Sequence, residues 1–297
     1  MFTPLRAIAP DATIAVIAPA GPSPSVRVEA ITPWLAARGL RAKIFPGCYE
    51  QTGYLAGSDA RRADDLLAAF ADPAVAAIIC MRGGYGSSRL LDKLDFALIA
   101  EHAKPFVGYS DITYLHTAFN QLARMPTLHA PMLTSDLLVN DDGASANALL
   151  DMLLGGVQSG MSLAPEGMAL HTLVGGRAQG RLTGGNLSVL SAALGTPYAM
   201  DARDAILFLE DVGEAPYKVD RMLTQLRHAG VLDAVCGFVI GSFSDADDPQ
   251  GVISELLTPL GKPVLCGWPA GHCVPNYPLP FGVEVVLDAR EQTLRVA

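Results

Sequence analysis

The sequence predicts an α/β protein of two domains, and three observations support this. The chain of 297 residues is long enough for two domains. Half of its residues are hydrophobic and 17% are charged, which excludes a disordered chain. Short β-branched apolar runs alternate with amphipathic Ala- and Leu-rich stretches, as in parallel sheets with crossover helices. We therefore expect an N-terminal parallel-sheet domain, Rossmann- or flavodoxin-like, and a C-terminal α/β domain with a mixed sheet.

The alternation is clearest in the first half of the chain. Strands are expected where short apolar runs end in turn residues, and helices where apolar positions recur at helical spacing. Ser58 and Asp59 are suited to cap one such helix. The run at 75–81 is apolar throughout, which is typical of a strand buried on both faces of a parallel sheet. The expected strands are 13–20, 41–47, 75–81 and 105–110, and the expected helices are 24–38, 58–72 and 111–123.

The stretch 155–176 is Gly-rich and lacks strong periodicity. We interpret it as the linker between an N-terminal domain, 1–154, and a C-terminal domain, 177–297. Beyond it the alternation resumes, and residues 283–297 have the pattern of a β-hairpin with its loop at 289–292. A hairpin beside crossover units makes the second sheet mixed. The expected helices are 186–194, 217–229 and 252–260, and the expected strands are 205–210, 234–243 and 263–268.

Charge and hydropathy exclude several partners. The net charge is −9, and Arg61-Arg62 is the only adjacent basic pair, so the chain lacks the clustered cations that bind nucleic acid or anionic membranes. No apolar run approaches the ~18 residues of a membrane span. The apolar start at 12–20 is short and preceded by Pro10 and Asp11, which fits a first strand better than a signal peptide. We expect a cytoplasmic protein that binds neither nucleic acid nor membrane.

The five cysteines indicate neither a disulfide framework nor a metal site. Their number is odd and they form no Cys-x-x-Cys pair. Cys80 and Cys236 lie within apolar runs, as small core residues do. Cys266, His272 and Cys273 lie close together, but their spacing fits no tetrahedral zinc site. We therefore expect no metal ion.

Ser110 follows a predicted strand and precedes a predicted helix, in the sequence Gly-Tyr-Ser-Asp. This arrangement resembles the nucleophile elbow of hydrolases, in which a sharp turn exposes the serine hydroxyl and the next backbone N–H can stabilise an oxyanion. Ile112 stands where the elbow motif has its second glycine. The alternative is that Ser110 is a helix cap and that Asp111 occupies the first helical turn.

A glycine-rich segment, residues 82–89 (the glycine loop), directly follows another predicted strand. It matches half of a dinucleotide fingerprint, but Arg89 replaces the third glycine and no acidic residue follows at the required distance. We expect instead that Gly83 and Gly84 present backbone N–H groups and that Arg82 binds a carboxylate with two parallel hydrogen bonds. The alternative is an ordinary glycine-rich turn with a surface arginine.

Glu210 ends the predicted strand 205–210, the position at which open α/β sheets place catalytic groups. It could instead cap a helix or pair with Arg221. Asp211 and Glu214 follow closely and compete for any catalytic role.

His272 lies in a Pro- and Gly-rich loop, which is typical of a functional residue on a rigid loop, although a lone loop histidine is usually only solvated. Asn186, after Gly184 and Gly185, could offer its amide to a polar ligand or could cap the following helix. Together, Ser110, Glu210 and His272 provide a nucleophile, a carboxylate and a base. Because such triads are defined by geometry rather than by chain order, we expect these three side chains to meet.

Five segments resemble the LD-carboxypeptidases, or muramoyltetrapeptide carboxypeptidases, to which the microcin-immunity serine peptidases are related. The similarity extends from about residue 12 to the end of the chain, and its motifs are RGGYGSSRLL, FVGYSDIT, GRLTGGNLSVL, FLEDVGEAPYKVDRML and PAGHCVPNYPLPFG. The resemblance implies that Ser110 is the nucleophile, Glu210 the acid and His272 the base. It also implies that the N–H groups of Gly84 and Asp111 form the oxyanion hole.

The resemblance further implies a homodimer with a triad drawn from both domains and with no metal or organic cofactor. The implied reaction releases the terminal D-alanine of a murein tetrapeptide through an acyl-enzyme, in cytoplasmic wall recycling. We expect Arg82 to bind the terminal carboxylate, and Gly83 and Asn186 to contribute to substrate binding.

Two alternatives stay open. The first is hydrolysis of peptidyl or aminoacyl adenylates of the microcin type. Adenine usually stacks on an aromatic side chain, and the sequence has no Phe, Trp or Tyr between Phe119 and Tyr198, which favours the murein peptide. The second is a non-catalytic two-domain peptide-binding protein, which the intact set of serine, glutamate and histidine argues against.

Overall fold

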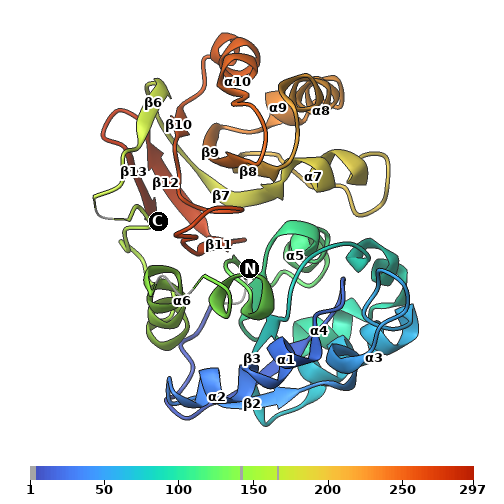
Figure 1. The fold of residues 1–297 in the computed structure, drawn as a ribbon. Coiled ribbons are helices and arrows are strands. Elements are labelled where there is room, and N and C mark those ends of the chain that lie inside the picture. The colour runs from blue at the N-terminus through green and yellow to red at the C-terminus, as the bar shows by residue number, and fades with distance from the viewer. Residues whose placement is uncertain (1–4, 141–142, 166) are drawn as a thin grey trace.

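The computed structural model describes residues 5–140, 143–165 and 167–297. The chain forms two β-sheets with helices packed around them (Figure 1). In Figure 1 the N-terminal half, blue to green, lies below the C-terminal half, yellow to red. The predicted α/β fold class is confirmed. None of the helices within these ranges is both long and apolar enough to span a membrane.

The first sheet has the strand order β11-β5-β4-β3-β1-β2. Its five N-terminal strands pair in parallel, whereas β11 pairs antiparallel with β5 at the edge. The strand bounds are β1 Thr13–Ile17, β2 Arg41–Ile44, β3 Val75–Cys80, β4 Phe106–Gly108, β5 Thr127–His129 and β11 Leu279–Phe281.

The helices of the N-terminal half follow the apolar periodicity. In α3, Ser58 caps the first turn by accepting a hydrogen bond from the N–H of Arg61. The predicted helix 24–38 is divided at Ala30 into two short helices, because Pro33 has no N–H to continue the ladder. The elements are α1 Ser25–Glu29, α2 Ile31–Ala36, α3 Asp59–Ala71, α4 Phe96–Glu101, α5 Thr113–Leu122 and α6 Ala144–Gly155, with shorter turns η1 Pro46–Tyr49, η2 Ser87–Lys93, η3 Ser110–Ile112 and η4 Leu133–Leu137.

The second sheet is mixed, with the strand order β13-β12-β7-β8-β9-β10-β6. The strands β7 to β10 pair in parallel, and β6, β12 and β13 add antiparallel edges. The strand bounds are β6 His171–Val174, β7 Arg177–Asn186, β8 Ala205–Val212, β9 Gly237–Ser244, β10 Val264–Cys266, β12 Glu284–Asp288 and β13 Thr293–Val296. The helical elements are α7 Leu187–Ala193, α8 Pro216–His228, α9 Val231–Ala234, α10 Gln250–Leu257 and η5 Thr258–Leu260.

The alternation of side chains along β8 explains how the two halves pack. Leu207 and Leu209 point into an apolar cluster formed with α7, α8 and α10. Phe208, between them, belongs to a second cluster that also contains Val107 of β4 and Phe281 of β11. The second sheet is therefore covered by helices on one face and packed against the N-terminal half on the other.

Two elements differ from the predicted organisation. The segment 155–176, interpreted as a linker, contains β6, which pairs with β10 at the edge of the second sheet. Within the predicted C-terminal domain, β11 leaves its own half and completes the first sheet. The domain limits themselves stay a prediction. Because β4 and β8 both end near the junction of the halves, residues at their carboxyl ends can meet there.

Candidate active site

Ser110 lies at a strained turn directly after β4. Its φ is 62°, in the left-handed region, a conformation that costs a non-glycine residue roughly 1–2 kcal/mol. The turn η3 then continues into α5. The glycine loop lies against this serine, because a Cβ atom built on Gly83 would lie only 3.0 Å from the Ser110 Cβ. The local structure is that of the nucleophile elbow, although Ile112 replaces the second glycine.

Three predicted side chains form one hydrogen-bonded chain, which we call the relay. His272 Nε2 lies 3.2 Å from Ser110 Oγ, and His272 Nδ1 lies 2.7 Å from Glu210 Oε2. Glu210 is completely buried, and its Oε2 also accepts the backbone N–H of His272 at 3.2 Å. The serine comes from the first half of the chain and the other two residues from the second. The predicted convergence of Ser110, Glu210 and His272 is therefore present in the structure.

The loop that carries His272 is fixed on both sides. Gly271, with a φ of 99°, has no room for a Cβ, because that atom would overlap the carboxylate of Glu210. Asn276 Oδ1 accepts the N–H of Gly271 at 3.0 Å, and the N–H of Asn276 donates to Ser145 Oγ of α6 at 2.9 Å. The imidazole is therefore held by the surrounding backbone as well as by Glu210.

The electrostatic surroundings of His272 favour its protonated form. Burial acts to lower the pKa of His272, but the hydrogen bond and charge of Glu210, with smaller contributions from Asp136 and Asp211, raise this pKa above its ordinary value of 6.5. A histidine in this position is a stronger base toward Ser110. It is also protonated, and so unable to accept the serine proton, over a wider acidic range.

Tyr109 and Asp136 support the imidazole from its side. The Tyr109 ring centre lies 4.9 Å from that of His272, and the Tyr109 hydroxyl donates to Asp136 Oδ1 at 2.7 Å. Asp136 Oδ2 also accepts from the N–H of Met132 at 2.9 Å. Sequence reasoning missed both residues. Tyr109 was visible only as a neighbour of Ser110, and Asp136 lies in η4, which no apolar pattern predicted.

The residues proposed for the oxyanion hole lie next to Ser110. Gly84 has a φ of 110°, and its N–H has no hydrogen-bond partner within the described part of the chain. Asp111 ties the two segments together, since its carboxylate accepts the N–H of Ser87 at 2.8 Å and its carbonyl accepts the Ser87 hydroxyl at 2.6 Å. The Asp111 side chain therefore anchors the glycine loop, while its N–H follows the nucleophile directly.

A buried arginine of α3 also holds the glycine loop. Arg62 is 1% exposed and donates through Nη1 to the carbonyls of Pro19 at 2.6 Å and Gly86 at 2.8 Å. Its Nη2 pairs with Asp59, which also accepts two hydrogen bonds from Arg89. Sequence reasoning did not assign this role. The available signal was that Arg62 lies on the apolar face of a predicted amphipathic helix.

A cleft of about 660 Å³ opens beside Gly84, and we call it the Arg82 cleft. Arg82 donates through Nη1 to the carbonyl of Pro22 at 3.2 Å, whereas its buried Nε has no partner among the described residues. Arg82 therefore contributes a positive charge to the cleft wall, and a guanidinium is suited to bind a carboxylate. The cleft is lined by Gly21, Pro22, Gln51, Gly53, Tyr54, Arg82, Gly84 and Tyr85.

Asn186 is paired with Glu210 across β7 and β8, outside the lining of the Arg82 cleft, and has internal partners. Its Oδ1 accepts the N–H of Val189 at 3.2 Å and caps α7, and its Nδ2 donates to Asp211 at 2.8 Å. Its backbone N–H donates to Thr113 Oγ1 at 3.1 Å, and the residue is 4% exposed. These contacts fit the helix-cap alternative, and the role of Asn186 in substrate binding stays a prediction.

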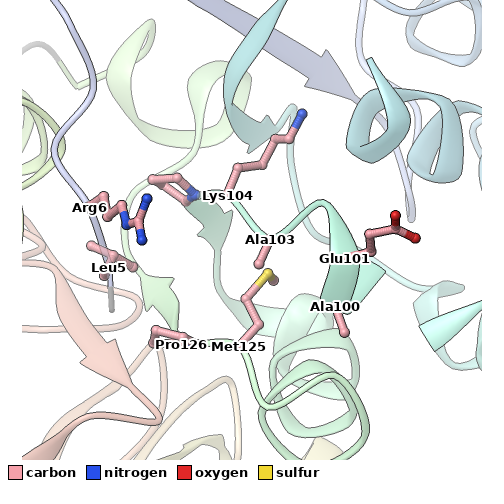
Figure 2. A pocket seen from close by; sticks show the side chains of 9 residues that line it. Leu5, Arg6, Ala100, Glu101, Ala103, Lys104, Met125 and Pro126 are labelled. Carbon is pink, nitrogen blue, oxygen red and sulfur yellow. The ribbon is translucent and has the colours of Figure 1, made fainter. Parts of the chain in front are cut away.

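A second cavity, of about 340 Å³, lies at the amino ends of β4 and β5 (Figure 2). Its lining includes Lys104, Pro105 and Pro126, which precede β4 and β5, whereas Ser110 follows β4. Lys104 is already bound by three backbone carbonyls, among them those of Ala69 and Asp72 at the end of α3. This cavity is therefore separated from the relay by the length of β4.

The described residues contain no group of three His, Cys, Asp or Glu side chains arranged to hold a metal ion. Cys266 and Cys273, considered with His272 as possible zinc ligands, form no such group there. The chemistry that the arrangement supports is nucleophilic, since a serine contacts a histidine that a buried carboxylate orients.

Comparison with known proteins agrees with this geometry. Residues 14–130 match a family model described as the LD-carboxypeptidase N-terminal domain, and residues 179–287 match that of the C-terminal domain. A relative in Bacillus subtilis strain 168, a probable murein peptide carboxypeptidase, is 37% identical over 95% of this chain and 90% of its own.

Two solved structures have the same fold. Muramoyltetrapeptide carboxypeptidase from Oxalobacter formigenes is 31% identical, with a TM-score of 0.83 over 96% of this chain and 97% of its own. The microcin C7 self immunity protein MccF aligns with a TM-score of 0.92 over 99% of this chain and 98% of its own. Because MccF is only 22% identical, this second likeness concerns the fold alone.

Proposed function

This chain belongs to the LD-carboxypeptidase family, and we propose that it hydrolyses the amide bond that joins a terminal D-alanine to the L-centre of a diamino acid in murein tetrapeptides. The single observation that carries the proposal is the relay, with contacts of 3.2 Å and 2.7 Å between Ser110, His272 and Glu210. The names of the relatives supply the class of substrate, a murein peptide.

In the first half of the reaction, His272 Nε2 accepts the proton of the Ser110 hydroxyl while Oγ attacks the amide carbonyl carbon. Glu210 keeps the other proton on Nδ1 and stabilises the imidazolium that forms. The N–H groups of Gly84 and Asp111 donate to the developing oxyanion, and each such donor is typically worth about 10²–10³ in rate.

In the second half, the carbon–nitrogen bond breaks and the departing amine takes the proton from His272. The acyl group stays on Ser110 as an ester. A water molecule, deprotonated by the same histidine, then attacks the ester, and the proton returns to Ser110 as the peptide leaves. No cofactor takes part in these steps.

The place of Arg82 supports exopeptidase specificity. The departing residue of a carboxypeptidase substrate carries a free carboxylate, and Arg82 lines the same cleft as Gly84. We therefore assign Arg82 to this carboxylate. Gly83 contributes indirectly, because its lack of a side chain lets the glycine loop approach Ser110.

Incubation of the purified protein with a murein tetrapeptide, followed by mass spectrometry, tests the proposed function. We expect one new peptide that lacks the terminal alanine, together with free D-alanine. Internal cleavage, or no cleavage under conditions in which the protein is folded, would contradict the proposal. The homodimer and the cytoplasmic location implied by the resemblance stay predictions.

Arg82→Ala should lower kcat/KM for peptides with a free C-terminus by about 10- to 100-fold, since a hydrogen bond to a charged group is worth ~1.5–3 kcal/mol. Most of the loss should appear in KM. Peptides that end in a C-terminal amide should lose much less, and Arg82→Lys should fall between, because lysine keeps the charge but not the bidentate fork. Equal losses on acids and amides, measured by steady-state kinetics, would contradict the carboxylate role.

The relatives favour the murein peptide over the adenylate alternative. The MccF likeness, at 22% identity, concerns the fold, whereas the relatives above 30% identity carry the names of murein peptide and muramoyltetrapeptide carboxypeptidases. No Phe, Trp or Tyr occurs between Phe119 and Tyr198, so a platform for adenine would have to come from aromatic residues elsewhere in the chain. The non-catalytic alternative is disfavoured by the relay, because a binding protein has no need for a serine held in a strained turn against a histidine.

A further inference from the structure

The Arg82 cleft is larger than a D-alanine requires, and one wall of it is aromatic. Tyr54 and Tyr85 contact each other, with ring centres 5.7 Å apart and planes at 67°. They remain 64% and 51% exposed, although both line the cleft. Exposed tyrosines in a cleft provide a rigid contact surface that is apolar on its faces and polar at its tip.

The tyrosine pair is held in place by the backbone around it. Tyr85 lies between Gly84 and Gly86 of the glycine loop, which Arg62 fixes through the Gly86 carbonyl. Tyr54 lies in a tight turn in which Thr52 and Leu55 exchange backbone hydrogen bonds of 2.8 and 3.1 Å. The backbone positions of both tyrosines are therefore fixed, which lowers the ordering cost when a ligand contacts their rings.

In the proposed mechanism, the departing residue of the substrate lies beside the tyrosine pair. The scissile carbonyl oxygen is bound at Gly84, and the terminal carboxylate is bound at Arg82, two residues along the same loop. The departing residue spans these points, so its side chain lies within reach of the rest of the cleft wall. That wall consists of Gln51, Gly53, Tyr54 and Tyr85.

We propose that Tyr54 and Tyr85 form a binding site for the side chain of the departing residue, and that the enzyme releases large apolar or aromatic D-amino acids from murein peptides as well as D-alanine. This inference rests on the proposed function. The chemistry is the same, since one amide bond is broken and water supplies the hydroxyl group and the proton. Among the described residues of the cleft, Arg82 is the only charged one, so a charged side chain finds no counter-ion there apart from Arg82 itself.

Matched tetrapeptides that differ only in the last residue, D-alanine or D-tryptophan, test the inference. The readout is the ratio of kcat/KM for the D-tryptophan peptide to that for the D-alanine peptide. We expect a ratio near or above 1 for the unmodified enzyme. Tyr54→Ala and Tyr85→Ala should each lower the ratio by about 10-fold, the upper range of one aromatic contact.

Tyr49→Ala provides the matched control. Tyr49 is 59% exposed and lies in the same segment as Tyr54, but it does not line the cleft. It should leave the ratio unchanged.

Four results would overturn the inference. They are release of D-alanine without any release of D-tryptophan, an unchanged ratio in both cleft variants, an equal fall in Tyr49→Ala, and inhibition by adenosine monophosphate that Tyr54→Ala abolishes. The last would assign the tyrosines to a nucleobase instead. If neither peptide is cleaved, the proposed function itself is wrong and the inference falls with it.

Discussion

Ser110→Ala should abolish the release of D-alanine, with a loss in kcat of at least about 10⁴-fold. Ser110 Oγ is the atom that forms the acyl-enzyme bond in the proposed mechanism. Without this nucleophile, only the oxyanion hole and substrate binding still contribute to catalysis. Substrate affinity should change little, because Arg82 and Gly84 are untouched. The check is quantitative mass spectrometry of a murein tetrapeptide, together with direct measurement of peptide binding.

The variant should also remain folded. Alanine in the left-handed turn at position 110 is no more strained than serine, because both residues carry a Cβ atom. The substitution removes one hydrogen bond of 3.2 Å to His272. The midpoint of thermal unfolding should therefore move by only a few degrees. Ser254→Ala, in α10 and remote from the relay, is the matched control and should keep full activity. Residual activity above one per cent in Ser110→Ala would exclude this serine as the nucleophile.

Sequence reasoning succeeded where one physical signal dominated. The buried parallel strands are continuous apolar runs, so β1, β3 and β8 were predicted close to their observed bounds. Ser110 and Glu210 were found because both come at the carboxyl end of such a run, where α/β proteins place their functional groups. That the loop of His272 reaches the same point depends on tertiary packing, because no local sequence pattern sets the direction of this loop.

The strand β7 was missed because its sequence opposes its structure. Gly180, Gly184 and Gly185 favour a turn, but each lies where another atom approaches the backbone too closely for a side chain. A Cβ at Gly184 would overlap the carbonyl of Phe208 in the neighbouring strand. Such a requirement comes from tertiary packing, and no local pattern encodes it.

The supporting residues of the site were missed for a similar reason. Arg62 and Asp136 act on the relay or the glycine loop across separations of more than twenty residues, and their types are common on surfaces. Asn186 was assigned to the substrate because its amide precedes a helix, a context that also describes a cap. The contacts with Val189 and Asp211 that favour the cap depend on the fold.

Glu210→Gln should lower kcat by about 10³- to 10⁴-fold with little change in the fold. Glutamine has the shape of glutamate but no charge, so the imidazolium that forms during serine attack is no longer stabilised. If the glutamine amide nitrogen faces His272, it also forces the proton onto Nε2, and the histidine then cannot accept the proton of Ser110. In either orientation, the buried carboxylate that raises the pKa of His272 is lost.

The pH profile separates this role from a merely structural one. His272 must be neutral to act as a base, so kcat/KM falls as the pH drops through the pKa of His272. In the unmodified enzyme this acidic limb lies above pH 6.5, because the net effect of Glu210, Asp136 and Asp211 outweighs burial. In Glu210→Gln the limb should move to lower pH while the plateau falls. A structural defect would lower the plateau and leave the limb in place.

Glu214→Gln is the matched control for this experiment. Glu214 competed with Glu210 for the catalytic role in the sequence, but it pairs with Lys218 at 3.2 Å, and neither side chain touches the relay. This variant should keep both the plateau and the limb. If Glu214→Gln lost activity while Glu210→Gln kept it, the carboxylate of the relay would be wrongly assigned, and the pKa of His272 would need another source.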